Sequence, residues 1–305
     1  MNPVRVAVLL TAFNGARWLD EQIQSILEQA NVNVTLFISV DRSTDGSEQL
    51  IDKLSAKEQR IQVLPHGLRF GGAASNFLRL FREVDFSTFD YISLSDQDDI
   101  WDANKLKAAT ELIQSENAGA YSSNALAFWE NGKTALIRKS QPQVKWDYFF
   151  EAAGPGCTYV LTKKLALAIQ ELLKLKSELS KQVGLHDWFI YAFARVNHFK
   201  WVIDEHALIA YRQHQSNEVG INSGWKAFVR RFEKVSSGWA LRQAILLSKL
   251  LDQDNNAFVK TWSSGSSLGL LKLSWHSWQC RRRVRDKLFF LFSCLYMALI
   301  GGVRP

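Results

Sequence analysis

The chain has 305 residues, of which 47% are apolar and 22% charged, so it is too apolar to be disordered and too aperiodic to be fibrous. At roughly 100 to 200 residues per domain, the length fits one large α/β domain with an appended region, or two modest domains. The three cysteines, Cys157, Cys280 and Cys294, are odd in number and lack metal-ligand spacing. This pattern argues against a disulfide framework or a zinc site and favours a reducing compartment.

The net charge of +7 is unevenly divided along the chain. Residues 221–305 hold 14 lysines and arginines against 4 acidic residues, a net +10, whereas the first 220 residues carry −3. A basic partner surface is therefore expected in the last quarter. Charge alone does not choose between nucleic acid and anionic lipid as its partner.

The first 125 residues alternate short apolar runs with segments of helical period. Strands are predicted at 4–10, 34–40, 61–64 and 91–95, and helices at the segment that contains Trp18 and ends near Ala30, at 48–57 and at 73–81. The amino-terminal apolar run is too short for a secretory signal and is interpreted as the first strand. This alternation predicts β-α-β units and an α/β fold with a mainly parallel sheet flanked by helices.

The pattern is weaker in the middle of the chain. Residues 127–155 mix aromatic, charged and turn residues without a period, which predicts a loop-rich insertion. Beyond it we expect a strand at 157–161, helices at 163–174 and 186–196, and two strands at 199–203 and 207–211.

Two acidic clusters follow strands, VDRSTDGS after the second and SDQDD after the fourth. In open parallel sheets ligands bind at the carboxyl ends of strands, so the clusters are expected in one crevice. Asp96, Asp98 and Asp99 would repel one another without a cation, which favours a divalent metal. An EF-hand is excluded by Trp101 and Lys107. Helix capping by one of these carboxylates is the structural alternative.

The second cluster contains Asp41, which directly follows a strand and is placed to accept hydrogen bonds from a base or a ribose. Asp45 and its neighbours are good turn and helix-capping residues, and need no ligand. Near the first strand, TAFNG offers backbone groups and the ring of Phe13 for stacking on a base, or an ordinary strand-to-helix turn.

Several motifs together resemble those of family 2 glycosyltransferases of the GT-A fold, in the bacterial rhamnosyltransferase-like branch that builds O-antigen and other surface polysaccharides. They are VAVLLTAFNGARWLDEQIQSIL, ISVDRSTDGS, SNFLRL, YISLSDQDDIWDANKL, GPGCTYVLTKKL, HDWFIYAFA and YRQHQSNEVG. The resemblance spans about residues 4–220. It implies inverting transfer of a sugar from a nucleotide-diphosphate sugar, dTDP- or UDP-linked, with a divalent cation, Mg²⁺ or Mn²⁺.

The resemblance also implies roles for particular residues. Asp98 and His214 would be metal ligands, and His214 could instead face the phosphates as a cation. Asp187 in HDW would be the catalytic base that deprotonates the acceptor, although an acid that opens an apolar helix is also a good cap. The residues expected to bind the nucleotide sugar are Thr11, Phe13, Asn14, Asp41, Asn76, Asp96 and Arg212.

Two motifs depart from the family's pattern. Val40 and Arg42 flank Asp41 where a second acid and a glycine are common, and Ala12 and Phe13 stand where Thr-Tyr is common. Arg42 is expected to crowd the turn and alter which nucleotide is accepted. An inactive nucleotide-sugar binder or assembly partner is therefore an alternative, as is a metal-dependent phosphohydrolase that uses an aspartate of SDQDD as nucleophile.

The last segment combines RRRVRDK with 16 uncharged residues, 288–303, a run short of the roughly 17 to 20 that a membrane span needs. Five tryptophans lie among the cations of the tail: Trp225, Trp239, Trp262, Trp275 and Trp278. We expect a GT-A domain at 1–220 and a basic helical region at 221–305 that associates with the anionic inner face of the cytoplasmic membrane. A hydrophobic helix buried against the main domain is the alternative. The acceptor would be a saccharide or a lipid-linked saccharide, and no nucleic-acid partner is expected.

Overall fold

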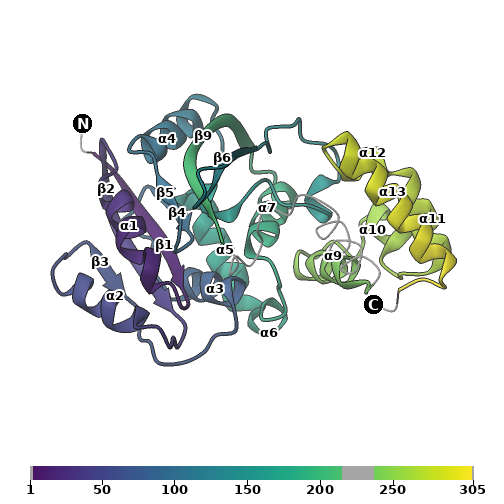
Figure 1. Cartoon of the computed structure of the whole chain (residues 1–305). Helices are drawn as coiled ribbons and strands as arrows, with labels where there is room; N and C mark the ends of the chain where they lie inside the picture. Colours follow the sequence, from purple (N-terminus) through teal and green to yellow (C-terminus); the bar gives the residue numbers. More distant parts are fainter. Residues whose placement is uncertain (1–2, 215–236, 304–305) are drawn as a thin grey trace.

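The computed structural model describes residues 3–214 and 237–303 and shows a mixed α/β fold around one sheet (Figure 1). Within these residues the sheet has nine strands in the order β3-β2-β1-β4-β8-β6-β9-β5, and β7 pairs with β6 outside this path. The strands are β1 (Val4–Ala12), β2 (Val32–Val40), β3 (Ile61–Val63), β4 (Tyr91–Ser95), β5 (Ile100–Trp101), β6 (Ala120–Trp129), β7 (Thr134–Ile137), β8 (Val160–Thr162) and β9 (Trp201–Gln213).

Helices pack on both faces of this sheet. They are α1 (Ala16–Leu27), α2 (Ser47–Ser55), α3 (Ala73–Glu83), α4 (Lys105–Ser115), α5 (Lys163–Leu175), α6 (Ser177–Ser180) and α7 (His186–Val196), with short 3-10 helices η1 (Asp147–Phe149) and η2 (Gly156–Thr158). Alternate residues of β1 enter two separate cores: Val6 and Val8 pack with α1, α2 and α4, whereas Ala7 and Leu9 pack with α3, α5 and α7. This alternation follows from the two-residue period of a strand.

The α/β prediction is confirmed, and the parallel part of the sheet is confined to its beginning and to one later pair. Strands β1, β2, β3 and β4 pair in parallel, as the continuous apolar runs predict. Beyond β4 the sheet is mixed, because β8 is antiparallel to both β4 and β6 while β9 runs parallel to β6.

Three predictions for the middle of the chain need correction. Part of the predicted insertion at 127–155 forms the β6–β7 hairpin, whose residues on β7 alternate between exposed and half-buried and so lack an apolar run. The strand predicted at 157–161 begins as η2, and only residues 160–162 pair. The two strands predicted at 199–203 and 207–211 are one strand, β9, because a bulge opposite Ser123 and Asn124 carries the polar residues Glu205 and His206 without ending the ladder.

The C-terminal region is helical, as predicted, and lies on the opposite side of the molecule from β2 and β3 (Figure 1). Its described helices are α9 (Trp239–Leu250), α10 (Ala257–Trp262), α11 (Ser267–Trp275), α12 (Ser277–Cys280) and α13 (Val284–Leu299). Phe258 stacks on Trp146 with ring centroids 4.6 Å apart, and Trp262 is buried against Phe149 and Phe150. These helices therefore share one core with α7, while the predicted boundary at 220/221 lies outside the described residues.

The basic cluster RRRVRDK is divided between the interior and the surface. Arg282 is 5% exposed, and its guanidinium lies 3.5 Å from the Glu151 carboxylate and 3.8 Å from that of Asp147. The Arg281 guanidinium donates to the carbonyl of Phe150. Both arginines thus join the tail to the segment around η1, and they are unavailable to an outside partner, contrary to the expectation that the whole cluster is a partner surface.

Helix α13 has one buried and one exposed face. Ser293, Cys294, Met297 and Ala298 are buried, whereas Val284, Leu288, Phe292, Tyr296 and Ile300 point outward at every fourth position. No helix among the described residues is both long enough and apolar enough to cross a membrane. Of the tail tryptophans, Trp262 is buried, Trp239 half-buried, and Trp275 and Trp278 exposed; Trp225 lies outside the described residues.

Candidate active site

A cavity of about 860 Å³ opens at the carboxyl ends of β1, β2 and β4, where the acidic clusters were expected to meet. Seven of the ten predicted site residues line it: Thr11, Phe13, Asp41, Asn76, Asp96, Asp98 and Asp187. Cavities of this size accommodate a small ligand with room for a second one. The single crevice predicted from the strand ends is therefore present.

Asp41 lies at the β2 end of the cavity, and its carboxylate holds a loop. Oδ1 accepts a hydrogen bond from the Phe70 amide at 2.7 Å, and Oδ2 accepts from Gly71 and Gly72 at 3.3 and 3.4 Å. Both glycines have positive φ, 97° and 121°, which lets their amides point to one carboxylate. Arg42 is exposed and does not line the cavity, and its expected effect on which nucleotide is accepted stays a prediction.

The turn after β1 is shaped by contacts with the loop after β4. The side chain of Gln97 accepts from the amide of Phe13 at 2.8 Å and donates to its carbonyl at 3.0 Å, which leaves the Phe13 ring 42% exposed at the cavity. Asn14 does not line the cavity, because its Oδ1 accepts from the Thr44 amide and ties the turn to the loop after β2. Asn76 does line it, and its Oδ1 accepts from Ser39.

The predicted metal ligands Asp98 and His214 contact each other. His214 Nε2 lies 2.7 Å from Asp98 Oδ2, and the His214 ring stacks on Trp18 with centroids 4.0 Å apart. Burial raises the pKa of Asp98, and the hydrogen bond to His214 opposes that rise. Arg212 is turned away from the cavity lining: its guanidinium donates to the carbonyl of Asp98 and pairs with Glu21. It therefore supports the aspartate loop rather than facing the cavity.

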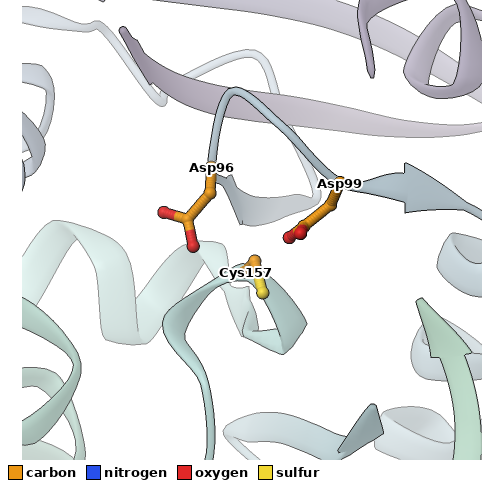
Figure 2. Close-up of side chains that lie close together, drawn as sticks. All are labelled: Asp96, Asp99 and Cys157. Atoms are coloured by element: carbon orange, nitrogen blue, oxygen red, sulfur yellow. The ribbon is translucent and has the colours of Figure 1, made fainter. Parts of the chain in front are cut away.

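A second group lies just behind these ligands (Figure 2). Asp96 and Asp99, on the loop between β4 and β5, flank the thiol of Cys157 on η2, with donor atoms within 4.8 Å of one another. Burial and the charges of Asp96 and Asp98 raise the pKa of Asp99, and burial also raises the pKa of the Cys157 thiol. Lys105 is buried nearby, and burial lowers the pKa of its amine to about 7.

The two groups differ in how well their donor atoms suit a hard divalent cation. Mg²⁺ keeps several waters and takes carboxylate oxygens, and Mn²⁺ accepts imidazole as well. Asp99 and Cys157 are fully buried and leave no room for such waters, and a thiol is a soft ligand. Asp96 and Asp98 both line the cavity and His214 contacts Asp98, so this donor set fits the cation. Within the described residues, the ligand atoms of Asp96, Asp98 and His214 do not all lie close enough together to form one cluster.

Asp187 lies in the first turn of α7 and lines the same cavity as Asp41. It is not the N-cap, which is Leu185, although its Oδ1 accepts from the Trp188 amide at 2.7 Å. His186 precedes it and stacks on Phe77, with centroids 4.0 Å apart. Burial lowers the pKa of His186 to about 3 and keeps its imidazole neutral.

Sequence reasoning missed several residues of the site. Gln97 and Gly156 shape the cavity through close contacts, and Lys105 lies under the aspartate loop from a helix. Five cations also line the cavity: Arg69, Arg138 and Lys139, which no motif marks, and Arg283 and Arg285 of the RRRVRDK cluster, which was expected at a membrane. Since these residues come together only through the fold, the sequence alone does not place them at one site.

Comparison with known proteins agrees with this geometry. The chain is 38% identical over 287 residues to a dTDP-rhamnosyl transferase of Shigella flexneri, a match that covers 94% of this chain and 99% of the relative. Two solved structures share its fold, the Staphylococcus aureus protein TarS in complex with UDP-GlcNAc (TM-score 0.53, 11% identity, 97% of this chain and 90% of that one) and a Pyrobaculum calidifontis mannosyltransferase in complex with GDP-Man and Mn²⁺ (TM-score 0.53, 15% identity, 98% and 89%).

These structures bear out the GT-A type of α/β fold expected from the sequence. The family model "Glycosyl transferase family 2" matches residues 7–173, which include most of β1, all of β2 to β8 and the whole aspartate loop. The sequence motifs, the fold and this match agree, and the chain belongs to glycosyl transferase family 2.

Proposed function

We propose that this glycosyltransferase moves a rhamnosyl group from dTDP-rhamnose to a saccharide or lipid-linked saccharide of a bacterial surface polysaccharide, with inversion at the anomeric carbon. The observation that carries the proposal is the single cavity that brings Asp98, paired with His214, and Asp187 to one space. The similarity of nearly the whole chain to a dTDP-rhamnosyl transferase supports the donor.

In this proposal the nucleotide lies at the β1 and β2 end of the cavity. The exposed ring of Phe13 provides a surface on which a base stacks, and Thr11 and Asn76 offer hydrogen bonds beside it. Asp41 acts by holding the Phe70 to Gly72 loop in place, and its carboxylate also borders the cavity where a base or ribose would lie. A bound Mg²⁺ or Mn²⁺ would neutralise diphosphate charge as the leaving group departs.

Asp187 is the proposed base for the acceptor hydroxyl. Inversion in one displacement requires a proton acceptor on the face opposite the leaving group. Asp187 and the Asp98 loop belong to different elements that border the same cavity, as this arrangement requires. The neutral His186 and its stack on Phe77 fix the start of α7 and thereby the position of Asp187.

We further propose that the protein lies on the anionic inner face of the cytoplasmic membrane. Ten of the sixteen large apolar side chains that are exposed within the described residues belong to residues 268–300. They include Trp275, Trp278 and the outward row of α13, a composition suited to the headgroup region of a bilayer.

A panel of nucleotide sugars, with and without Mn²⁺, tests the function. We expect dTDP-rhamnose to be turned over only with the cation, and Asp98→Ala to lose turnover while its circular dichroism spectrum is kept. Asp20→Ala, an exposed substitution on α1, serves as the matched control. Full activity of Asp98→Ala would overturn the metal assignment. Hydrolysis of simple phosphate esters would favour a phosphohydrolase, and donor binding without turnover an inactive binder.

A further inference from the structure

Four basic side chains from two distant segments line the cavity. Arg138 and Lys139 follow β7, and Arg283 and Arg285 stand at the start of α13. The two segments are neighbours in space, because Lys139 interacts electrostatically with Glu151 and, in the tail, with Arg282, Arg281 and Asp286. The fold therefore gathers these cations beside one space, and the proposed donor chemistry uses none of them.

The cations border the end of the cavity that holds Asp187. A Cβ atom built on Gly154 would lie 3.7 Å from Cβ of Lys139, and one built on Gly156 would lie 3.4 Å from Cβ of Asp187. Only Pro155 separates these two glycines, so Lys139 and Asp187 are near neighbours across a short segment. The Asp41 end lies on β2, whereas β7 pairs with the same edge of β6 as β8, which is three strand spacings from β2. At about 4.8 Å each, this is on the order of 15 Å.

Neighbouring carboxylates pair with two arginines of the tail and with one of the four cavity cations, but the other three cavity cations have no ion pair in the described part of the chain. Arg281 and Arg282 pair with Glu151, and Arg282 also lies near Asp147. Arg138, Lys139 and Arg283 form no ion pair with any residue in the described part of the chain, and Arg285 pairs with Asp286 at 3.5 Å. Like charges gathered beside one cavity repel each other until an anion binds, and arginine is well matched to phosphate.

The same helix start carries the outward apolar row. Val284 and Leu288 are exposed on α13, in the same two turns as Arg283 and Arg285. If a ligand carries both a phosphate and a hydrocarbon chain, its phosphate could bind the cations while its hydrocarbon chain lies on this apolar row. We infer that these four cations bind the phosphate groups of a lipid-phosphate-linked acceptor and present its sugar to Asp187. This inference rests on the proposed function and names the acceptor class for it.

Farnesyl diphosphate, which carries a prenyl chain and a diphosphate, is the probe. Its binding is measured calorimetrically on the full-length protein in EDTA, which prevents metal-bridged binding at the aspartates, and again with saturating dTDP and Mn²⁺. We expect binding in both conditions and none of farnesol. Arg283→Gln/Arg285→Gln should weaken binding roughly tenfold, as loss of two charge-assisted contacts implies. Arg138→Gln, from the other segment, should weaken it as well.

Lys272→Gln is the matched control, because Lys272 is exposed in the same basic region but does not line the cavity. Absence of farnesyl diphosphate binding, or its displacement by dTDP and Mn²⁺, would overturn the inference. So would a double variant that binds the probe normally but no longer sediments with phosphatidylglycerol vesicles, since the cations would then serve lipid headgroups. Turnover of dTDP-rhamnose is measured separately, so its failure rejects only the proposed function.

Discussion

Asp187 lies where it could act either as a catalytic base or only as a residue that stabilises the start of α7. Substitutions distinguish these two roles. Asp187→Asn keeps the size of the side chain and an oxygen that accepts from the Trp188 amide, but it removes the proton acceptor. We expect turnover to fall by roughly 10²-fold or more with little change in donor affinity. Steady-state kinetics and donor titration measure the two effects.

The companion variant Asp187→Ala controls for stability. Loss of the Trp188 contact should cost about 1 kcal/mol in the free energy of unfolding. A fully active Asn variant beside a merely less stable Ala variant would make Asp187 structural.

His186 links the site to acid stability. Burial lowers the pKa of its imidazole to about 3, below the ordinary 6.5. Between these two pH values the imidazole binds a proton in the unfolded chain but not in the folded protein. The contribution of His186 to stability is complete above pH 6.5 and is lost as the pH falls toward 3, by up to about 1.4 kcal/mol per pH unit. In urea titrations at several pH values, His186→Gln should lose less stability than the wild type between pH 6.5 and 4. Parallel curves would refute this pKa.

Among the contacts between elements, η2 and α7 approach each other closely at Gly156. A Cβ atom on Gly156 would lie 2.6 Å from Nε2 of His186, and the stacked ring of Phe77 prevents the imidazole from moving away. We expect Gly156→Ala to lower the free energy of unfolding by about 1 to 3 kcal/mol and to reduce turnover by displacing Asp187.

Gly154→Ala is the control for this contact, because the nearest atom to its Cβ lies at 3.4 Å, an ordinary separation. Thermal melts and turnover of the two variants are compared. Equal behaviour of the two alanine variants would show that Gly156 is not a steric requirement.

The elements also show where a single sequence is informative. The positions of β1 to β4 and of α7 follow from continuous apolar runs and helical period, so pattern alone predicts them. The β6–β7 hairpin was missed because the side chains of β7 alternate between exposed and half-buried, and so give no apolar run that marks a strand. In the site, Asp96, Asp98 and Asp187 stand out as acids next to apolar elements. The basic cluster at 283–285 is visible in the sequence, but nothing there places it beside Arg138 and Lys139, because only the tertiary fold brings them together.

On the scale of the whole molecule, membrane association is best tested on the exposed face of α13. Removal of residues 281–305 would also remove the buried Arg282 and Cys294, and would damage the core. Leu288→Ser/Phe292→Ser changes only outward side chains, so it should reduce sedimentation with phosphatidylglycerol vesicles several-fold while the melting temperature stays unchanged.

Leu167→Ser/Leu175→Ser, on the exposed side of α5, is the matched control and should sediment like the wild type. If the α13 variant sedimented as well as the wild type, or if neither protein sedimented, this surface would not be a membrane contact.

The buried pairing of Arg282 with Asp147 and Glu151 has a consequence for biosynthesis. Asp147 hydrogen-bonds to Tyr191 and Arg195 of α7, but its second arginine comes from a segment more than 130 residues later in the chain. On a ribosome, part of the charge of the segment around η1 therefore stays uncompensated while nearly half of the chain is still being made. The amino-terminal strands can assemble early. In contrast, the contact between η1 and α7, the helix that carries Asp187, is completed only when the last helices emerge. Nascent chains halted before Arg282 should accordingly remain sensitive to protease around residue 147.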